Sequence, residues 1–425
     1  MGEKRMGEKR MKEKMTKLEK YWILYDVGNS AFVLLVSTIL PIYFNALAGQ
    51  GGVSEVDALA YWGYAMSVST LLVAFIGPAL GAIADTEGYK KPVFTVCVAA
   101  GAAGCGALAM PVGWFLFLVI FVAAKVGYSS SLIFYDAMLS DVTEPSRMDQ
   151  ISSQGYAWGY IGSCVPFILS LVLVLGNERL GITAETAMGA AFFLNAAWWL
   201  AATVPLLRHY RQKHGVPRQS HVVRESFGRL AKVVKDIRGN KKIMLFLLAF
   251  FFYIDGVYTI IEMATAYGSA IGLEPQGLLL ALLVTQLVAF PCALLFGSLA
   301  KKYKNTTLIK VCIVCYFFIA LFAIQLDRQW EFWFLAVCVG MFQGGIQALS
   351  RSYFASIIPP EKSGEFFGIF DICGKGASFI GTALVGAMTQ LTRNPGSGVG
   401  MLAALFAVGL VLFRKAAALP NPYTP

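Results

Sequence analysis

Long apolar stretches separated by short polar segments dominate the chain. A bilayer core about 30 Å thick requires about 20 residues of helix, because each residue advances a helix by about 1.5 Å. Twelve stretches reach that length: 21–48, 59–84, 92–111, 114–140, 153–176, 186–207, 242–272, 275–300, 306–326, 330–357, 364–390 and 397–418. Strands of a membrane barrel would alternate in hydropathy over about ten residues, so the pattern predicts twelve transmembrane helices.

The longest polar connection divides six apolar stretches from six, and the two halves resemble each other. Gly81 aligns with Gly297 at an offset of 216, and Asp136 aligns with Arg351 at an offset of 215. Both halves also run in the same direction across the membrane, which is typical of a parallel repeat. We expect a basic tail over 1–20, a six-helix bundle over 21–207, a linker over 208–241, a second bundle over 242–419 and a tail over 420–425.

Composition and charge support an all-α integral membrane protein. The chain is 57% hydrophobic and 14% charged, with a mean hydropathy of +0.63, which does not suit soluble domains. On the side of the N-terminus the connections carry 29 Lys and Arg residues, against 3 on the other side. Basic connections stay in the cytosol, so we expect both termini to be cytosolic. We also expect a multi-pass, monomeric protein of the inner (plasma) membrane. The net charge of +10 reflects this topology and contact with anionic lipid, and it does not indicate a nucleic-acid partner.

The linker contains one segment with helical periodicity. Over 220–239, apolar residues recur at near-helical spacing with basic residues between them. The pattern predicts an amphipathic helix on the cytosolic membrane surface. A helix that binds a partner protein is the alternative.

Enzymatic chemistry and cofactors are not expected. The three histidines, His209, His214 and His221, all lie in the linker, so no catalytic triad or histidine metal site can form inside the membrane. The stretch GIFDICGKG imitates a phosphate-binding loop, but its spacing is wrong and it lies in an apolar stretch. The sequence therefore predicts no catalytic residues, no metal and no cofactor.

The connection after the second stretch resembles the cytosolic loop signature of the major facilitator superfamily. Its pattern is Gly81-x-x-x-Asp85-x-x-Gly88-x-Lys90, where Gly81 permits close helix packing and Asp85 can meet a helix N-terminus. The resemblance implies a conformational latch, formed by these four residues. The basic residue that usually follows the aspartate is replaced here by Thr86.

Three further stretches resemble a narrower subfamily. They are YDVGNSAF, YIDGVYTIIEMATAYGSAIGL and QGGIQALSRSYFASIIPPEKSGEFFGIF, and they lie near both ends of the chain. The subfamily includes uncharacterised bacterial facilitators and the fungal vacuolar effluxer that returns amino acids after autophagy. The resemblance implies transport of small solutes, with amino acids as the best-supported class. Val27 stands where the subfamily usually has Trp.

Charged residues within the apolar stretches are candidates for solute binding, because a charge at mid-bilayer costs at least about 2.5–3.5 kcal/mol. Lys125 lies near the middle of the fourth stretch, and Ser129 shares its helical face. In the facilitator fold, stretches one, four, seven and ten line the central cavity, so the resemblance implies that Lys125 holds a solute carboxylate. An internal ion pair is the alternative reading.

Two carboxylates of the seventh stretch are candidates for proton coupling or for binding the amino group of a zwitterion. Asp255 and Glu262 are seven residues apart and share a helical face, where mutual repulsion favours binding of a proton. A structural hydrogen-bonding role is the alternative. On the tenth stretch, Gln343 and Gln347 lie one turn apart and offer neutral solute contacts, or packing between helices.

A gate is expected where stretches one, four and ten reach the cytosol. Asp136 and Arg351 have opposite charges at repeat-related positions, which indicates an ion pair that forms and breaks during transport. Arg351 reaching toward the membrane surface is the alternative. Asp26 lies near the cytosolic end of the first stretch and is assigned to the same gate, and Asn29 is a further solute contact.

These observations predict a secondary active transporter of a small polar solute, with protons as the driving ion. Its two bundles rock around a site near the midplane. A carrier of sugars, drugs or lipids is the alternative within transport. A membrane sensor of the same fold that moves no solute is the alternative outside it.

Overall fold

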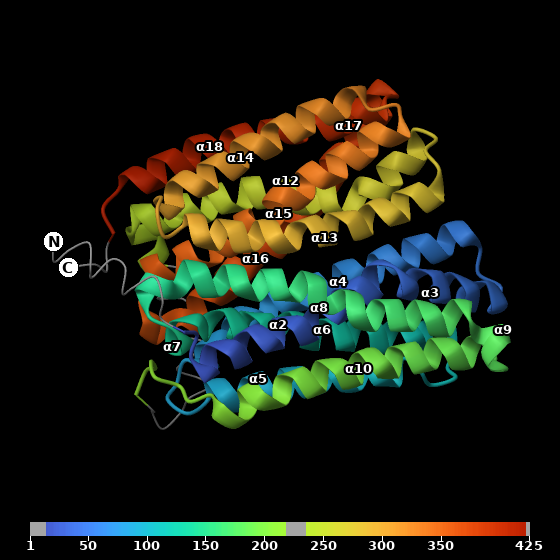
Figure 1. The fold of residues 1–425 in the computed structure, drawn as a ribbon, viewed down its shortest axis with the longest axis horizontal. Coiled ribbons are helices and arrows are strands. Elements are labelled where there is room, and N and C mark those ends of the chain that lie inside the picture. Colours follow the sequence, from blue (N-terminus) through green and yellow to red (C-terminus); the bar gives the residue numbers. More distant parts are fainter. Residues whose placement is uncertain (1–13, 218–234, 422–425) are drawn as a thin grey trace.

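The computed structural model describes residues 14–217 and 235–421, whose helices form two bundles that lie side by side (Figure 1). The first bundle, the N-half, contains α2 (Lys17–Ser37), α3 (Ile39–Gln50), α4 (Glu55–Ala84), α5 (Lys90–Ala107), α6 (Trp114–Ala137), α7 (Leu139–Val142), α8 (Met148–Leu175), α9 (Asn177–Leu180) and α10 (Ala184–His209). A 3-10 turn, η1 (Pro145–Arg147), precedes α8. The described residues contain no strand, so the expected all-α architecture is confirmed.

The second bundle, the C-half, repeats this arrangement. It contains α12 (Lys241–Ala270), α13 (Pro275–Leu299), α14 (Asn305–Phe322), α15 (Gln329–Ile357), α16 (Ser363–Thr392), α17 (Pro395–Gly400) and α18 (Leu402–Ala418), with 3-10 turns η2 (Ala323–Gln325) and η3 (Pro360–Lys362). In both halves a long helix corresponds to each of the predicted apolar stretches.

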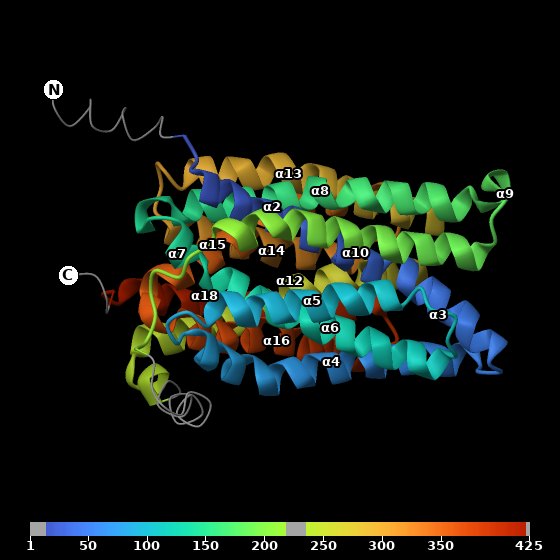
Figure 2. The ribbon, with the colours of Figure 1, turned by 90° about the horizontal axis from the view of Figure 1, so that it is seen from below.

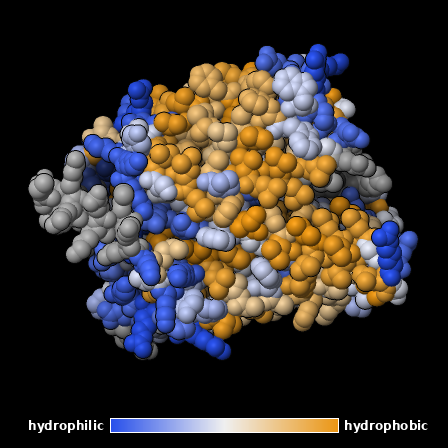
Figure 3. Space-filling view, in the orientation of Figure 1, coloured by the Kyte–Doolittle hydropathy of each residue, from blue (hydrophilic) through white to orange (hydrophobic). Residues whose placement is uncertain are grey.

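The outer surface suits a membrane. Within the described residues, ten segments are long and apolar enough to cross a bilayer by length and composition. The long helix α5 stands outside that set and begins with Lys90 and Lys91. Figure 3 shows an apolar band across the middle of the molecule, with hydrophilic residues gathered toward its ends. Large apolar side chains are exposed in this band, as expected where lipid replaces water.

Both ends of the described chain lie at one end of the molecule, called here the terminal end (Figures 1 and 2). The short helix α7 also lies there, whereas α9 marks the opposite end. Most of the amphipathic helix predicted over 220–239 falls on residues 218–234, outside the described residues, and so does the tail over 1–13.

The first apolar stretch differs from the single span that the sequence predicts. Its helix begins at Lys17, inside the segment expected as a tail, because Thr16 and Glu19 form a capping box. It then breaks at Thr38, which separates α2 from α3. Pro41 follows the break and has no N–H for the main-chain bond across it, which is the usual cause of such an interruption.

The two halves meet mainly through α4 with α16 and α8 with α13, and also through α8 with α15 and α6 with α16. In Figure 1, α8 and α13 lie close together near α7 and separate toward the end marked by α9. Hydrogen bonds between the halves gather at the terminal end, where Ser152 donates to the carbonyl of Ala348 at 2.8 Å and Asn305 and Ser352 both donate to Asp149. The described structure is therefore a conformation that is closed at its terminal end.

Candidate functional site

Asp85 joins the two halves at the terminal end by capping a helix of the other half. Its Oδ1 accepts the N–H of Gly364 at 2.8 Å, and its Oδ2 accepts the N–H of Glu365 at 2.8 Å. Both donors lie in the first turn of α16, where main-chain N–H groups have no partner within the helix. The carboxylate also lies at the positive end of the helix dipole, so it holds α16 against the N-half.

A close approach of two glycines makes this contact possible. A side chain at Gly81 would place its Cβ 2.3 Å from the carbonyl oxygen of Gly364, and one at Gly364 would lie 2.7 Å from the carbonyl oxygen of Gly81. Both obstacles are main-chain atoms, which cannot move aside as a flexible side chain can. The repeat-related Gly297 makes a similar approach in the C-half, where a Cβ would lie 2.8 Å from the Cβ of Ser153.

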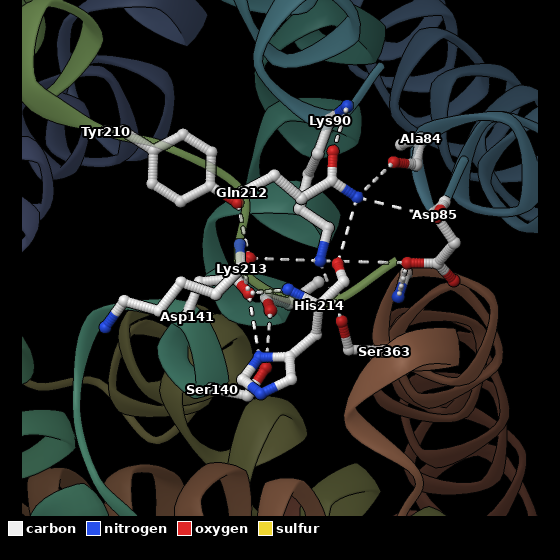
Figure 4. Close-up of polar contacts among 12 residues, drawn as sticks. Ala84, Asp85, Lys90, Ser140, Asp141, Tyr210, Gln212, Lys213, His214 and Ser363 are labelled. Atoms are coloured by element: carbon white, nitrogen blue, oxygen red, sulfur yellow. Dashed lines mark hydrogen bonds and ion pairs between the residues drawn. The ribbon is translucent and has the colours of Figure 1, made fainter. Parts of the chain in front are cut away.

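Lys90 completes a buried charged network around this contact (Figure 4). Its side chain is 0% exposed, and its Nζ donates to Ser363 Oγ at 2.9 Å and to Asp141 Oδ2 at 3.3 Å. The Nζ also lies 3.8 Å from Asp85 Oδ1. One lysine thus connects two carboxylates of the N-half with the first residue of α16. We call Asp85, Lys90, Asp141 and Ser363 the latch network.

The segment after α10, residues 210–216, packs onto the latch network (Figure 4). Tyr210 donates its hydroxyl hydrogen to Asp141, and the main-chain N–H of His214 donates to Asp141 Oδ1 at 2.9 Å. Gln212 Oε1 accepts the N–H of Gly88 at 3.1 Å, where a backbone φ of 82° requires glycine. Sequence reasoning missed this segment, because its partners are more than 60 residues away and it has no motif of its own.

Acidification should weaken the latch network through Asp141. Burial by itself raises the pKa of this carboxyl, but Lys90, Tyr210 and His214 outweigh burial and hold the pKa below its ordinary value of 3.8. A pKa lowered in the folded state means that the stabilisation is present above about pH 4 and is lost as the pH falls further. We expect the Tm of the purified protein to fall more steeply from about pH 5 to pH 3 than the Tm of Asp141→Asn. Equal slopes for the two proteins would contradict this role.

Arg351 lies between the halves, a short distance further into the molecule. Its Nη1 donates to Asp136 Oδ1 at 3.0 Å, and its Nη2 lies 3.8 Å from Asp26 Oδ2. Its Nε donates to Ser152 Oγ at 2.9 Å. The residue is only 2% exposed, so its guanidinium does not extend to the surface. The three residues assigned to the gate from sequence are thus brought together in one cluster.

Aromatic rings cover the guanidinium of Arg351. Its Cζ lies 4.3 Å from the ring centroid of Tyr156, 4.7 Å from that of Trp22 and 5.4 Å from that of Tyr135. Each distance is within the range of a cation–π contact. Sequence reasoning missed the three rings, since aromatic residues are common in apolar helices and nothing marks these three as a set.

Lys125 and Glu262 come from different halves and act on each other electrostatically. Lys125 is half-buried near the middle of α6, whereas the side chain of Glu262 on α12 is exposed within the described structure. The attraction between the two charges acts from one half to the other. The structure therefore presents a cation and an anion on opposite sides of the interface between the halves.

The remaining solute contacts predicted from sequence lie in varied surroundings. Ser129 and Asn29 are buried, and Asn29 donates to the carbonyl of Tyr25 at 3.0 Å and to Asp26 Oδ1 at 3.4 Å. Gln343 is buried beside the hydroxyl of Tyr160, and Gln347 is partly exposed one turn further along α15. Asn29 is therefore held within the N-half by its own helix.

Asp255 does not share the environment of Glu262, although seven residues separate them on one helix. Asp255 is 1% exposed, and its Oδ1 accepts the N–H of Gly381 at 3.0 Å and the hydroxyl of Thr259 at 3.2 Å. The carboxylate thus binds the main chain of α16 within the C-half. The sequence-based picture of two carboxylates on one water-filled face does not describe this arrangement, because α16 covers Asp255.

Comparisons with known proteins agree with this architecture. The family described as Vacuole effluxer Atg22 like matches residues 15–146 and 139–417. The uncharacterized MFS-type transporter YxiO of Bacillus subtilis (strain 168) is 42% identical over 402 residues, which cover 93% of this chain and 94% of that protein. Autophagy-related protein 22-1 of Neosartorya fischeri is 26% identical over 269 residues, which cover 57% of this chain and 43% of the fungal protein. The chain thus spans less than half the length of that fungal relative.

Solved structures share the fold at low sequence identity. The transporter FucP in its outward conformation has a TM-score of 0.72 and 14% identity, covering 95% of this chain and 98% of that structure. A bacterial homologue of the iron transporter ferroportin in an outward-facing state has a TM-score of 0.71 and 14% identity, covering 95% and 99%. At this identity the likeness concerns the fold alone.

Proposed function

The chain belongs to the Atg22-like family of transporters of the major facilitator type, and on that premise we propose that it moves a small polar solute, an amino acid, across the membrane by alternating access, driven by protons. Transporters of this type are not enzymes and bind small molecules within the bilayer. The proposal concerns the solute, the driving ion and the residues that handle them.

The observation that supports the solute class is the pair of opposite charges that Lys125 and Glu262 contribute from the two halves. An amino acid carries a carboxylate and an ammonium group, and Lys125 and Glu262 offer one partner for each. Lys125 and Glu262 belong to different halves, so a bound zwitterion would connect the halves. Its binding would therefore depend on the relative position of the halves. Sugars have no charges to match this pair, and lipids require a long apolar site, so both are weaker candidates.

The direction of opening follows from the latch network and the charge distribution. The 29 basic residues on the side of the termini place the terminal end in the cytosol. In this orientation the inter-half hydrogen bonds close the cytosolic side, which supports an outward-facing conformation. Breaking the contacts of Asp85 and Arg351 would open the cytosolic side, in the manner of rigid halves that rock around a central site. We further propose that the protein works as a monomer in the plasma membrane.

Glu262 is the better of the two candidates for proton coupling. Its side chain is exposed and interacts electrostatically with Lys125, whereas Asp255 accepts a hydrogen bond from the main chain of α16. We expect Glu262→Gln to lose uptake driven by a pH gradient while keeping a reduced exchange of labelled solute, because a glutamine cannot bind and release a proton but its amide oxygen can still accept a hydrogen bond from an ammonium group. Asp255→Asn should mainly lower the Tm. Concentrative uptake that survives in both variants would reject coupling through these residues.

The test of the proposed function is a flux screen in proteoliposomes. Purified protein is exposed to a panel of labelled amino acids, sugars and lipids, with and without a pH gradient. We expect flux of at least one amino acid, stimulated by the gradient. Flux of only a sugar or a lipid would refute an amino acid as the solute. Absence of flux with every solute would favour a sensor that does not transport.

A further inference from the structure

The groups that hold Arg351 all belong to the N-half, whereas Arg351 itself belongs to the C-half. The N-half residues in contact with its guanidinium are Trp22 and Asp26 of α2, Tyr135 and Asp136 of α6, and Ser152 and Tyr156 of α8. We call these six residues the cation cage. Arg351 thus occupies the cage as a ligand tethered to the other half of the molecule.

The cation cage is held in shape by contacts that do not involve Arg351. The rings of Trp22 and Tyr135 stack with centroids 4.2 Å apart, and the indole N–H of Trp22 donates to the carbonyl of Tyr135 at 2.9 Å. Asn29 donates to the other carboxylate oxygen of Asp26 at 3.4 Å. These contacts lie within the N-half, so the cage can persist when the halves move apart.

Gly155 leaves space for the cage and its occupant. A Cβ at this position would lie 2.9 Å from Asp26 Oδ2, 3.0 Å from the ring of Trp22 and 3.1 Å from Arg351 Nη2. A side chain here would therefore collide with the cation and with two groups that bind it. The glycine makes α8 one wall of a site shaped around a planar cation.

The charge of the cage requires a cation. Two carboxyl groups face one guanidinium, so the cluster carries an excess negative charge whenever both are ionised. When the terminal end opens, Arg351 moves away with the C-half and leaves both carboxylates beside three aromatic rings. Such a combination recognises ammonium and guanidinium groups through charge and cation–π contacts.

We infer that the cation cage is a binding site for an organic cation, occupied by Arg351 while the terminal end is closed and by the guanidinium or ammonium group of the solute when that end is open. The identity of the occupant as the solute rests on the proposed function. Solute and Arg351 compete for one site, so a solute bound there holds the terminal end open. This arrangement favours solutes with a cationic side chain, such as arginine and lysine, over neutral amino acids.

Chemical rescue tests the cage without any transport measurement. In purified Arg351→Ala the cage is empty, and we expect methylguanidinium to raise the Tm, whereas methylurea, which has a similar shape and no charge, does not. Adding Trp22→Ala should weaken methylguanidinium binding by about fivefold to thirtyfold, since it removes one cation–π contact. Wild-type protein, whose cage is filled, should show no difference between the two compounds. Equal effects of both compounds on Arg351→Ala would overturn the inference and leave protonation of Asp26 and Asp136 as the way the empty cage is neutralised.

A second measurement keeps the native Arg351, so it does not depend on whether Arg351→Ala folds. Ser153 is buried between the halves at the terminal end, so a cysteine there reports opening of that end by its reaction with a maleimide. We expect arginine added on the terminal side to accelerate this reaction, and its neutral analogue citrulline to have a smaller effect. The difference should disappear in Asp26→Asn. Equal acceleration by both, or by neither, would contradict the cage. Rescue by methylguanidinium without flux of any amino acid would refute the proposed function and leave the cage intact.

Discussion

Replacement of Lys125 by alanine should reduce solute flux by about one to two orders of magnitude while leaving folded protein in the membrane. A hydrogen bond to a charged group contributes about 1.5–3 kcal/mol, and each 1.4 kcal/mol corresponds to a factor of ten. Loss of the ammonium also leaves Glu262 without the charge that opposes it. The measurement is uptake of labelled amino acid in proteoliposomes, normalised to the amount of folded protein.

Two matched variants separate binding of solute from an internal ion pair. Lys125→Arg keeps the charge and should keep part of the flux. Lys125→Glu combined with Glu262→Lys reverses the pair, so it restores an internal ion pair but turns the solute around in its site. Full flux in the reversed pair would support a purely structural role, and flux near that of wild type in Lys125→Ala would refute solute binding by Lys125.

Loss of the Asp85 carboxylate should open the terminal end. Asp85→Ala removes two charge-assisted hydrogen bonds to the main chain of α16. At about 1.5–3 kcal/mol for each bond, the balance between closed and open forms should shift by at least about 100-fold. The measurement is reaction of Ser153→Cys with a maleimide, in a background in which the eight native cysteines are replaced. Flux should fall at the same time, because the transporter no longer returns to the outward-facing form.

Two glycines of α4 supply the control for this experiment. Gly81→Ala places a methyl group 2.3 Å from a carbonyl oxygen of α16 and should open the terminal end as Asp85→Ala does. Gly63→Ala lies in the same helix with nothing within 4 Å of the added carbon, so it should leave the labelling rate unchanged. Slow labelling in both Asp85→Ala and Gly81→Ala would show that the latch network does not control opening.

Much of the architecture is readable from local patterns in the sequence. Runs of apolar residues determine which segments become long helices, because a helix satisfies its own main-chain hydrogen bonds wherever it lies. The repeat offset of 215 also predicts that Asp136 and Arg351 face each other, and the two side chains lie 3.0 Å apart. The break at Thr38 also has a local signal, because Pro41 follows it. The prediction of twelve continuous helices nevertheless does not include this break.

The surroundings of the site depend on packing between distant segments. Asp255 and Glu262 share a helical face in the sequence, yet α16 covers only Asp255. Residues 210–216 read as part of a polar linker, yet Tyr210, Gln212 and His214 pack against the latch network. Neither contact has a periodicity or a motif that marks it.

The sequence by itself therefore determines which segments form the long helices and in what order, the division into two halves and the loop that carries Asp85. The tertiary structure alone decides that Trp22, Tyr135 and Tyr156 surround Arg351 and that Lys125 opposes Glu262. The physical reason is the range of the interactions. Helix formation and membrane insertion depend on neighbouring residues, whereas the cage and the charge pair depend on how two bundles dock against each other.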